Sequence, residues 1–133
     1  GAEANKIEPR KRMLSSMTPT IVTKNNKLAI VVGTPGGSTI ITSVFQTLVN
    51  VIDFEMNIDQ AVQSPRFHHQ WLPDAIMCEK DAIAPKERRI LESIGHKLKD
   101  RESIGRVEGI FITQDNKIHG AADRRGDDSV QGF

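Results

Sequence analysis

The 133-residue sequence lacks several features that would assign a protein to a class at once. It has a single cysteine, Cys78, which excludes an internal disulfide and offers none of the paired spacing of a structural zinc site. We expect Cys78 to be an inert, buried thiol. Eighteen basic and seventeen acidic residues leave a net charge of +1, so charge gives no reason to expect a nucleic acid or an anionic membrane as a partner.

Long apolar runs are missing as well. The sequence has no stretch of about 18 apolar residues, and its first residues are charged where a signal peptide needs an apolar segment. We therefore expect neither a membrane-spanning helix nor an export signal in this chain. Residues 1–12 resemble an interior loop, which suggests a piece of a longer protein.

The periodicity of apolar residues predicts an α+β fold in one small domain. Two β-rich runs joined by Lys-Asn-Asn predict an antiparallel hairpin, and the apolar residues beyond it recur at the spacing of a buried helix. Hairpins with helices between them fit an antiparallel sheet layered with helices, in an α+β or four-layer arrangement, better than a doubly wound parallel sheet. The expected elements are strands at 19–23 and 27–32, helices at 40–52 and 57–63, a loop at 66–73, a strand at 75–79 and a helix at 85–94 that Pro85 opens and Gly95 follows. An edge strand at 96–100 is expected to precede a second hairpin, formed by strands at 107–113 and 117–122.

The segment Gly33-Thr-Pro-Gly-Gly-Ser38 lies between the second expected strand and the first helix. Gly36 and Gly37 would place unobstructed backbone N–H groups at the positive end of a helix that Ser38 or Thr34 can cap. Such donors can hold an oxyanion or a phosphate, although a plain strand-to-helix turn has the same pattern. The lysine of a Walker P-loop and the glycine spacing of a dinucleotide site are absent, so nucleotide binding is disfavoured.

Two other segments have polar side chains suited to binding. Ser15 and Ser16 are adjacent hydroxyl donors before a strand, and they either bind a carboxylate or form a polar turn. Residues 66–73 contain two adjacent histidines, whose side chains diverge in most backbones, and no carboxylate stands at ligand spacing. Packing and hydrogen bonding are therefore favoured over a metal site there.

The tail, residues 123–128, alternates acidic and basic residues and contains an Arg-Gly-Asp tripeptide. That tripeptide is too short to indicate adhesion, and alternating charges usually mean solvated or locally paired side chains. We assign no role to the tail. Across the chain, no pattern supplies a nucleophile beside a general base.

Three of these motifs, taken in order, resemble the C-terminal part of the small subunit of γ-glutamyltranspeptidase. They are residues 11–22, Lys-Arg-Met-Leu-Ser-Ser-Met-Thr-Pro-Thr-Ile-Val, residues 33–38, and residues 64–73, Ser-Pro-Arg-Phe-His-His-Gln-Trp-Leu-Pro. The resemblance covers essentially the whole chain. It implies part of a four-layer αββα N-terminal-nucleophile hydrolase, made as a proenzyme that cleaves itself into a large and a small subunit. Residues 1–133 would then be a single partial domain, and the nucleophilic threonine and the large subunit would lie outside it.

The resemblance also implies roles for four residues. Gly36 and Gly37 match the glycine pair whose N–H groups form the oxyanion hole, and Ser15 and Ser16 match the serine pair that binds the α-carboxylate of the γ-glutamyl group. The implied reaction is attack by the threonine on a γ-glutamyl amide such as glutathione, with transfer to an amino acid, a peptide or water. It needs no metal or organic cofactor, and this chain alone would be inactive. Near the end, the sequence Asp-Arg-Arg at 123–125 departs from the family's Asp-Pro-Arg pattern.

Three alternatives remain open at this stage: a relative that deacylates cephalosporin side chains, a family member that has lost activity, and a non-catalytic module that binds an anion at Gly36 and Gly37. The expected partners are γ-glutamyl compounds, amino-acid or peptide acceptors, the upstream small-subunit segment and the large subunit, with no nucleic acid and no membrane contact. Exposed apolar edges of a shared sheet would also favour self-association of the fragment. The family resemblance implies a periplasmic or extracellular location.

Overall fold

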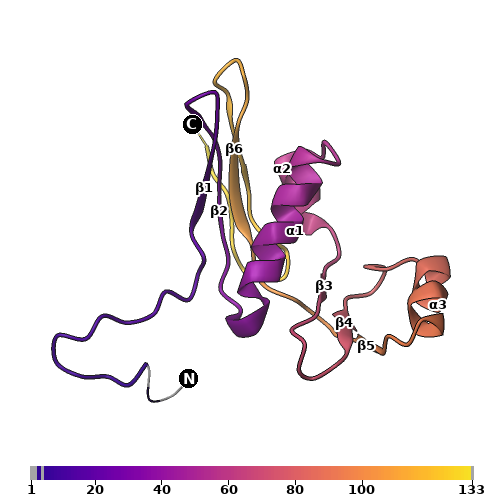
Figure 1. The fold of residues 1–133 in the computed structure, drawn as a ribbon. Helices are drawn as coiled ribbons and strands as arrows, with labels where there is room; N and C mark the ends of the chain where they lie inside the picture. The colour runs from indigo at the N-terminus through magenta and orange to yellow at the C-terminus, as the bar shows by residue number, and fades with distance from the viewer. Residues whose placement is uncertain (1–2, 4, 133) are drawn as a thin grey trace.

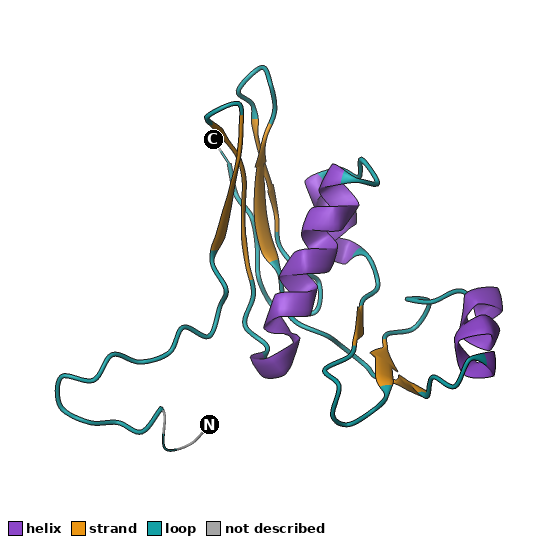
Figure 2. Ribbon diagram, viewed as in Figure 1, coloured by secondary structure: helices purple, strands orange, loops and turns teal. Residues whose placement is uncertain are grey.

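The chain folds into two β-sheets and a set of helices that lie mainly on one side of the larger sheet (Figures 1 and 2). The structure is a computed structural model and describes Glu3 and residues 5–132. The elements are β1 (Thr20–Lys24), β2 (Lys27–Gly33), a 3-10 turn η1 (Gly37–Thr39), α1 (Ile40–Ile52), α2 (Ile58–Gln63), β3 (Phe67–His68), β4 (Ile76–Cys78), α3 (Pro85–Ser93), β5 (Leu98–Asp100), β6 (Glu108–Ile112) and β7 (Ile118–Ala121).

The larger sheet is antiparallel throughout, with strand order β1-β2-β6-β7. The β1–β2 hairpin turns at Asn25 and Asn26, whose φ angles of 52° and 60° are those that the tight hairpin turn requires. The two expected hairpins are confirmed. The two hairpins join where β2 pairs with β6, with Val32 opposite Gly109. These two strands are far apart in the sequence.

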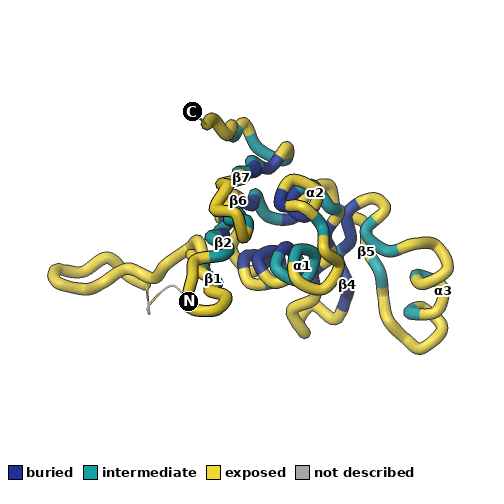
Figure 3. The backbone as a smooth tube through the Cα atoms, turned by 90° about the horizontal axis from the view of Figure 1, so that it is seen from above, coloured by how far each residue is buried: buried dark blue, intermediate teal, exposed yellow. Residues whose placement is uncertain are grey.

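Helices α1 and α2 cover one face of this sheet, and the main core lies between them and the strands (Figure 3). Gly109 permits a close approach, because a Cβ atom there would lie 2.9 Å from Cδ1 of Ile58 in α2. Asn57 starts α2 with a capping box: its side chain accepts from the Gln60 amide, and the Gln60 side chain accepts from the Asn57 amide. The core cluster consists of Ile30, Val32, Val44, Ile58, Val62, Val107 and Ala121.

Helix α1 has the expected boundaries, but it is not buried on all sides. Ile40 and Val44 face the core, whereas Ile41 and Phe45 are 72% and 63% exposed. The expectation of a buried helix is therefore wrong for its outer side, because no element in the described part of the chain packs there. The second face of the sheet is similarly open at Ile21, which is 68% exposed.

The smaller sheet has the order β3-β4-β5, and it differs from expectation in two ways. Strand β3 forms inside the segment expected to be a loop, and β5 pairs with β4 in parallel rather than joining the later hairpin. Helix α3 begins with Pro85 at its first turn and is followed by Gly95 at φ 101°, as expected. The α+β class, with an antiparallel sheet packed against helices, is confirmed.

Before β1, the chain runs as an extended arm away from the sheets (Figure 1). Ile7 and Met13 on this arm are 98% and 80% exposed. Within the residues that the structure describes, no helix has the length and apolarity to cross a membrane.

Candidate active site

The turn between β2 and α1 takes a backbone path that favours glycine at two consecutive positions. Gly36 has φ 143° and Gly37 has φ 61°, both in regions that other residues rarely adopt. A Cβ atom on Gly36 would also lie 2.8 Å from Oγ1 of Thr39, whereas a Cβ on Gly37 would meet no atom within 4 Å. The turn then winds directly into η1 and α1.

The amide groups of Gly36 and Gly37 are available to a ligand. Both residues are exposed, and in the described part of the chain neither amide donates a hydrogen bond to another residue. No acidic or basic side chain lies in the first turn of η1 or of α1. Two unbonded N–H groups at the start of a helix can stabilise a negative charge.

The expected helix cap is not formed by Ser38 or Thr34. No side chain caps η1 or α1, because the Thr34 hydroxyl instead donates to the Pro35 carbonyl at 2.6 Å. The same Thr34 oxygen accepts from the backbone amide of Arg106 at 2.7 Å. Thr34 is fully buried, so it belongs to the support beneath the turn rather than to its exposed surface.

A distant segment, residues 104–107, supports the turn from below. Gly105, at φ 69°, lies against it, and a Cβ there would be 2.6 Å from the Ser43 hydroxyl and 3.2 Å from that of Thr34. Sequence reasoning missed this contact. The glycine at 105 has no local signal of its role, because its neighbours are about 70 residues away in the sequence.

Ser15 and Ser16 lie on the exposed arm, directly before Met17, whose carbonyl meets the start of the segment 33–38. The Thr34 amide donates to the Met17 carbonyl at 3.0 Å, which ties the end of the arm to the residue after β2. Both serines are exposed, and neither side chain hydrogen-bonds within the described residues. The arm that carries the serines is thus joined to the segment 33–38 at Thr34.

Residues 66–73 are held by packing and hydrogen bonds, as expected. His68 is 3% exposed, with Nδ1 at 2.7 Å from the Thr42 hydroxyl and Nε2 at 2.9 Å from Oε1 of Gln70. The neighbouring His69 diverges and lies 3.4 Å from Asp74. Arg66 is 1% exposed and forms part of a buried ionic cluster.

This ionic cluster joins Arg66, Glu79, Asp123 and Arg125. Arg66 lies 2.8 Å from Asp123, and Arg125 bridges Glu79 at 2.5 Å and Asp123 at 2.9 Å. Sequence reasoning placed Asp123 and Arg125 in a solvated or locally paired tail. The expectation of local pairing is confirmed, because Asp123 and Arg125 pair with each other, but the two side chains are not solvated. They pack against Arg66, which precedes β3, and Glu79, which follows β4.

The cluster fixes the segment that supports the turn. Glu79 accepts from the Ile104 amide at 2.6 Å, Arg66 donates to the Ile104 carbonyl at 2.9 Å, and Asp123 accepts from the Val107 amide at 2.8 Å. Residues 104–107 are therefore held on both sides of Gly105. The four charged side chains are structural, and they affect the turn only through residues 104–107.

The charges of the cluster are maintained by mutual contact. Burial opposes the ionised form of Glu79, but hydrogen bonds from Arg125 and from the amides of Arg66 and Ile104 outweigh it and hold the pKa of Glu79 below its ordinary value. Burial likewise opposes the charge on Asp123, and amide donors and Arg66 lower its pKa. Burial lowers the pKa of Arg66, whose Nε is buried without a partner among the described residues.

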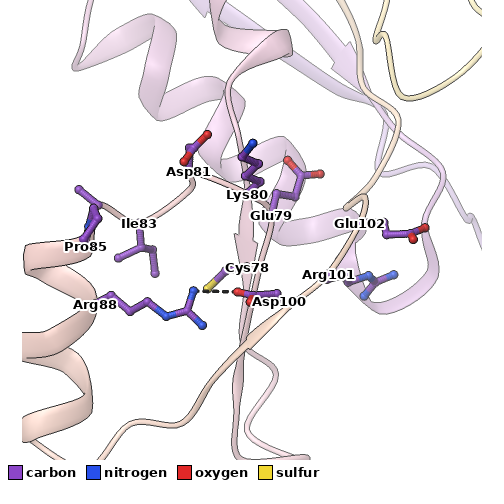
Figure 4. Close-up of a pocket in the computed structure, with 11 residues that line it drawn as sticks. Cys78, Glu79, Lys80, Asp81, Ile83, Pro85, Arg88, Asp100, Arg101 and Glu102 are labelled. Atoms are coloured by element: carbon purple, nitrogen blue, oxygen red, sulfur yellow. Dashed lines mark hydrogen bonds and ion pairs between the residues drawn. The ribbon is translucent and has the colours of Figure 1, made fainter.

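Cys78 lies beside a separate cavity of about 660 Å³ between β4, α3 and β5 (Figure 4). The thiol is 1% exposed, and burial raises its pKa, so its interpretation as an inert, buried thiol agrees with the structure. Arg88 and Asp100 pair across the cavity at 2.7 Å. None of the four predicted site residues lines it.

The family model and the related sequences agree on one family for this chain. The family model for Gamma-glutamyltranspeptidase matches residues 1–133. The chain is 46% identical over 134 residues to the glutathione hydrolase proenzyme of Escherichia coli (strain K12), covering 100% of this chain and 23% of that protein. It is 33% identical over 122 residues to the acylase ACY 1 proenzyme of Pseudomonas sp. (strain V22), covering 91% of this chain and 21% of that protein.

A solved structure shows the same fold. The T380A mutant of Helicobacter pylori gamma-glutamyltranspeptidase aligns with a TM-score of 0.83 and 46% identity, covering 95% of this chain and 69% of that chain. The chain thus spans about a quarter of the length of the curated relatives it matches.

Proposed function

Because the chain belongs to the gamma-glutamyltranspeptidase family, whose members include glutathione hydrolases, we propose that it forms part of the acyl-transfer site of such an enzyme. The parent enzyme would cleave γ-glutamyl amides such as glutathione and transfer the γ-glutamyl group to an amino acid, a peptide or water. The observation that supports this most directly is the pair of exposed, unbonded amides at Gly36 and Gly37.

In this proposal the two amides form the oxyanion hole. Attack on the γ-amide carbonyl turns its oxygen into an oxyanion, and a fixed donor aimed at that oxygen lowers the barrier by about 3 kcal/mol. The nucleophile is a threonine outside this chain, which forms an acyl-threonine intermediate. The isolated chain is accordingly inactive, and the reaction uses no metal or organic cofactor.

Ser15 and Ser16 supply the second half of the site. Their hydroxyls are exposed and free of partners among the described residues, and the Met17–Thr34 hydrogen bond holds the arm beside the turn. Adjacent hydroxyl donors are suited to the α-carboxylate of a γ-glutamyl group. That arrangement favours a γ-glutamyl substrate.

The remaining proposals concern the parent protein. Residues 1–133 form the C-terminal part of its small subunit, and they assemble with the upstream small-subunit segment and the large subunit in the periplasm or outside the cell. The open outer face of α1 is consistent with such partners, and it would also favour self-association of the isolated chain. A cephalosporin-acylase-like activity is the second candidate, supported by the 33% identity to the acylase ACY 1 proenzyme.

The test replaces Gly37 with alanine in the parent enzyme. A Cβ at this position meets no atom within 4 Å, so the change mainly disturbs the backbone of the turn. We expect kcat for a γ-glutamyl amide to fall about 10²-fold, with KM little changed. Gly95→Ala is the matched control, because Gly95 also has a positive φ and open space around it but lies after α3.

Two results would contradict the proposal. One is a Gly37→Ala enzyme with the same kcat and KM as Gly95→Ala. The other is a Gly37→Ala enzyme whose kcat/KM falls only because KM rises, with kcat unchanged. Assays with a γ-glutamyl amide and with a cephalosporin side-chain amide distinguish the two candidate activities. Tight anion binding by the isolated chain in calorimetry, without activity in the parent, would favour a non-catalytic module.

A further inference from the structure

Two buried threonines hold the carbonyl groups on either side of Gly36. The Thr34 hydroxyl donates to the Pro35 carbonyl at 2.6 Å, and the Thr39 hydroxyl donates to the Gly36 carbonyl at 2.9 Å. Both side chains are inaccessible to solvent, at 0% and 1% exposure. The two bonded carbonyls belong to the peptide units whose N–H groups are those of Gly36 and Gly37.

The orientation of each N–H follows from that of its carbonyl. In a planar trans peptide the C=O and N–H groups point in opposite directions. Because the Pro35 and Gly36 carbonyls are directed onto buried hydroxyls, the amides of Gly36 and Gly37 are directed away from the protein interior. This agrees with their exposure and with the absence of any partner for them in the described chain.

We propose that Thr34 and Thr39 are positioning residues that orient the two oxyanion donors, each through one backbone carbonyl. The inference rests on the proposed function of Gly36 and Gly37. Glycine makes such support necessary, since residues without a side chain have the freedom to rotate a peptide unit and turn its N–H inward. The hydroxyls keep each N–H directed outward before the reaction begins. An oxyanion hole requires donors that are already oriented in this way.

The Thr34 hydroxyl is itself oriented by the supporting segment. The Arg106 amide donates to Thr34 Oγ1 at 2.7 Å, so the hydroxyl uses a lone pair there and has its single proton free for the Pro35 carbonyl. Gly105 allows the two segments to approach closely enough for this contact. The orientation of the Gly36 amide therefore depends on a residue pair about 70 positions apart.

The two threonines contribute unequally. Within the described residues the Pro35 carbonyl accepts only from Thr34, whereas the Gly36 carbonyl also accepts from the Thr39 amide at 3.2 Å. Removing the Thr39 hydroxyl leaves a second bond in place, but removing that of Thr34 leaves none. We therefore expect Thr34→Val to lower kcat more than Thr39→Val does.

The experiment measures kcat and KM of the parent enzyme for a γ-glutamyl amide. Valine keeps the shape of threonine and removes the hydroxyl, and serine keeps the hydroxyl. Because one oxyanion donor is worth about 10²–10³ in kcat, we expect about a 100-fold loss for Thr34→Val and about a tenfold loss for Thr39→Val, each with KM little changed. Thr34→Ser and Thr39→Ser should retain most of the activity.

Thr47→Val is the matched control. Thr47 is equally buried in α1, and its hydroxyl donates to the Ser43 carbonyl at 3.0 Å, away from the turn. It should lose stability to about the same degree as Thr39→Val, without a selective loss of kcat. In amide NMR spectra of the assembled parent enzyme, Thr34→Val should move the Gly36 resonance and Thr39→Val that of Gly37, whereas Thr47→Val should move neither.

The possible results separate this inference from the proposed function. If Gly37→Ala lowers kcat about 10²-fold but Thr34→Val and Thr39→Val behave like Thr47→Val, the positioning inference is wrong and the oxyanion assignment stands. If Gly37→Ala leaves kcat intact, the oxyanion assignment is wrong. If the serine variants lose as much activity as the valine variants, the hydroxyls are not the groups that orient the amides.

Discussion

Replacing Glu79 with glutamine should destabilise the chain strongly, because this carboxylate has four donors in a buried site. It accepts from the backbone amides of Arg66 and Ile104 at 2.8 and 2.6 Å and from two nitrogens of Arg125 at 2.7 and 2.5 Å. Glutamine has nearly the same shape, but it has one acceptor oxygen and an NH₂ group that would face donors. The change therefore isolates charge and hydrogen bonding from packing.

The magnitude follows from the burial of these groups. Glu79 is 6% exposed, and removing one partner of a buried ion pair costs about 3–5 kcal/mol, since the other charge is left uncompensated. After the substitution, Arg125 still pairs with Asp123. The positive charges of Arg66 and Arg125, however, would both lack the compensation that Glu79 gives them. A domain of this size has a total stability of about 5–15 kcal/mol, so the loss would be a large fraction of it.

The assay is urea denaturation of the purified chain, followed by circular dichroism at pH 7. Glu55→Gln provides the control, because Glu55 is exposed and forms no ion pair among the described residues. We expect the midpoint of Glu79→Gln to fall by an amount equivalent to about 3 kcal/mol or more, and that of Glu55→Gln to remain within about 0.5 kcal/mol of the wild type. A loss below about 1 kcal/mol for Glu79→Gln would refute the view that this cluster holds residues 104–107 in place.

The start of α2 and the C-terminal tail each offer a further test. Asn57→Ala removes the side-chain half of the α2 capping box and should lower the free energy of unfolding by about 1 kcal/mol, measured by the same denaturation and compared with Gln114→Ala in an exposed turn. Partial burial and a hydrogen bond to Asp128 raise the pKa of Glu108 from its ordinary value of 4.5 to about 7. Protonated Glu108 therefore stabilises the tail fully below pH 4.5, and this stabilisation is lost as the pH rises through 7. Amide hydrogen exchange of Gly126, whose N–H donates to the Asp123 carbonyl, should show weaker protection at pH 8 than at pH 5 after correction for intrinsic rates, and a Glu108→Gln variant with the same pH dependence would contradict this assignment.

Much of the local structure could be predicted from the sequence. The boundaries of α1 follow from its apolar spacing, those of α3 from Pro85 and Gly95, and the first hairpin from its paired asparagines. The Gly36–Gly37 turn was also predictable, because glycine adopts positive φ angles with the least strain, above all the 143° of Gly36. These features depend on residues that are neighbours in the chain, where short-range sterics and hydrogen bonding decide the outcome.

Pairings between distant segments could not be predicted in this way. Strand β6 pairs with β2 rather than only with β7, and β5 joins β4 in parallel, because packing of the whole domain selects among strands of similar propensity. Of the two alternatives for residues 123–128, local pairing is present and solvation is wrong for Asp123 and Arg125, for the same reason. A charged tail is usually solvated, and only the tertiary fold places Arg66 and Glu79 where Asp123 and Arg125 can be buried at low cost.

The sequence by itself thus determined the class of fold, the glycine turn and the family of this chain. The tertiary structure decided what supports that turn. Thr34 looks like an ordinary capping candidate in the sequence, and neither Thr39 nor Gly105 has an evident role there, yet folding brings the three into one set of contacts around Gly36. Backbone conformation is set by local sterics, whereas the direction in which a peptide N–H is held depends on which distant groups bind the opposite carbonyl.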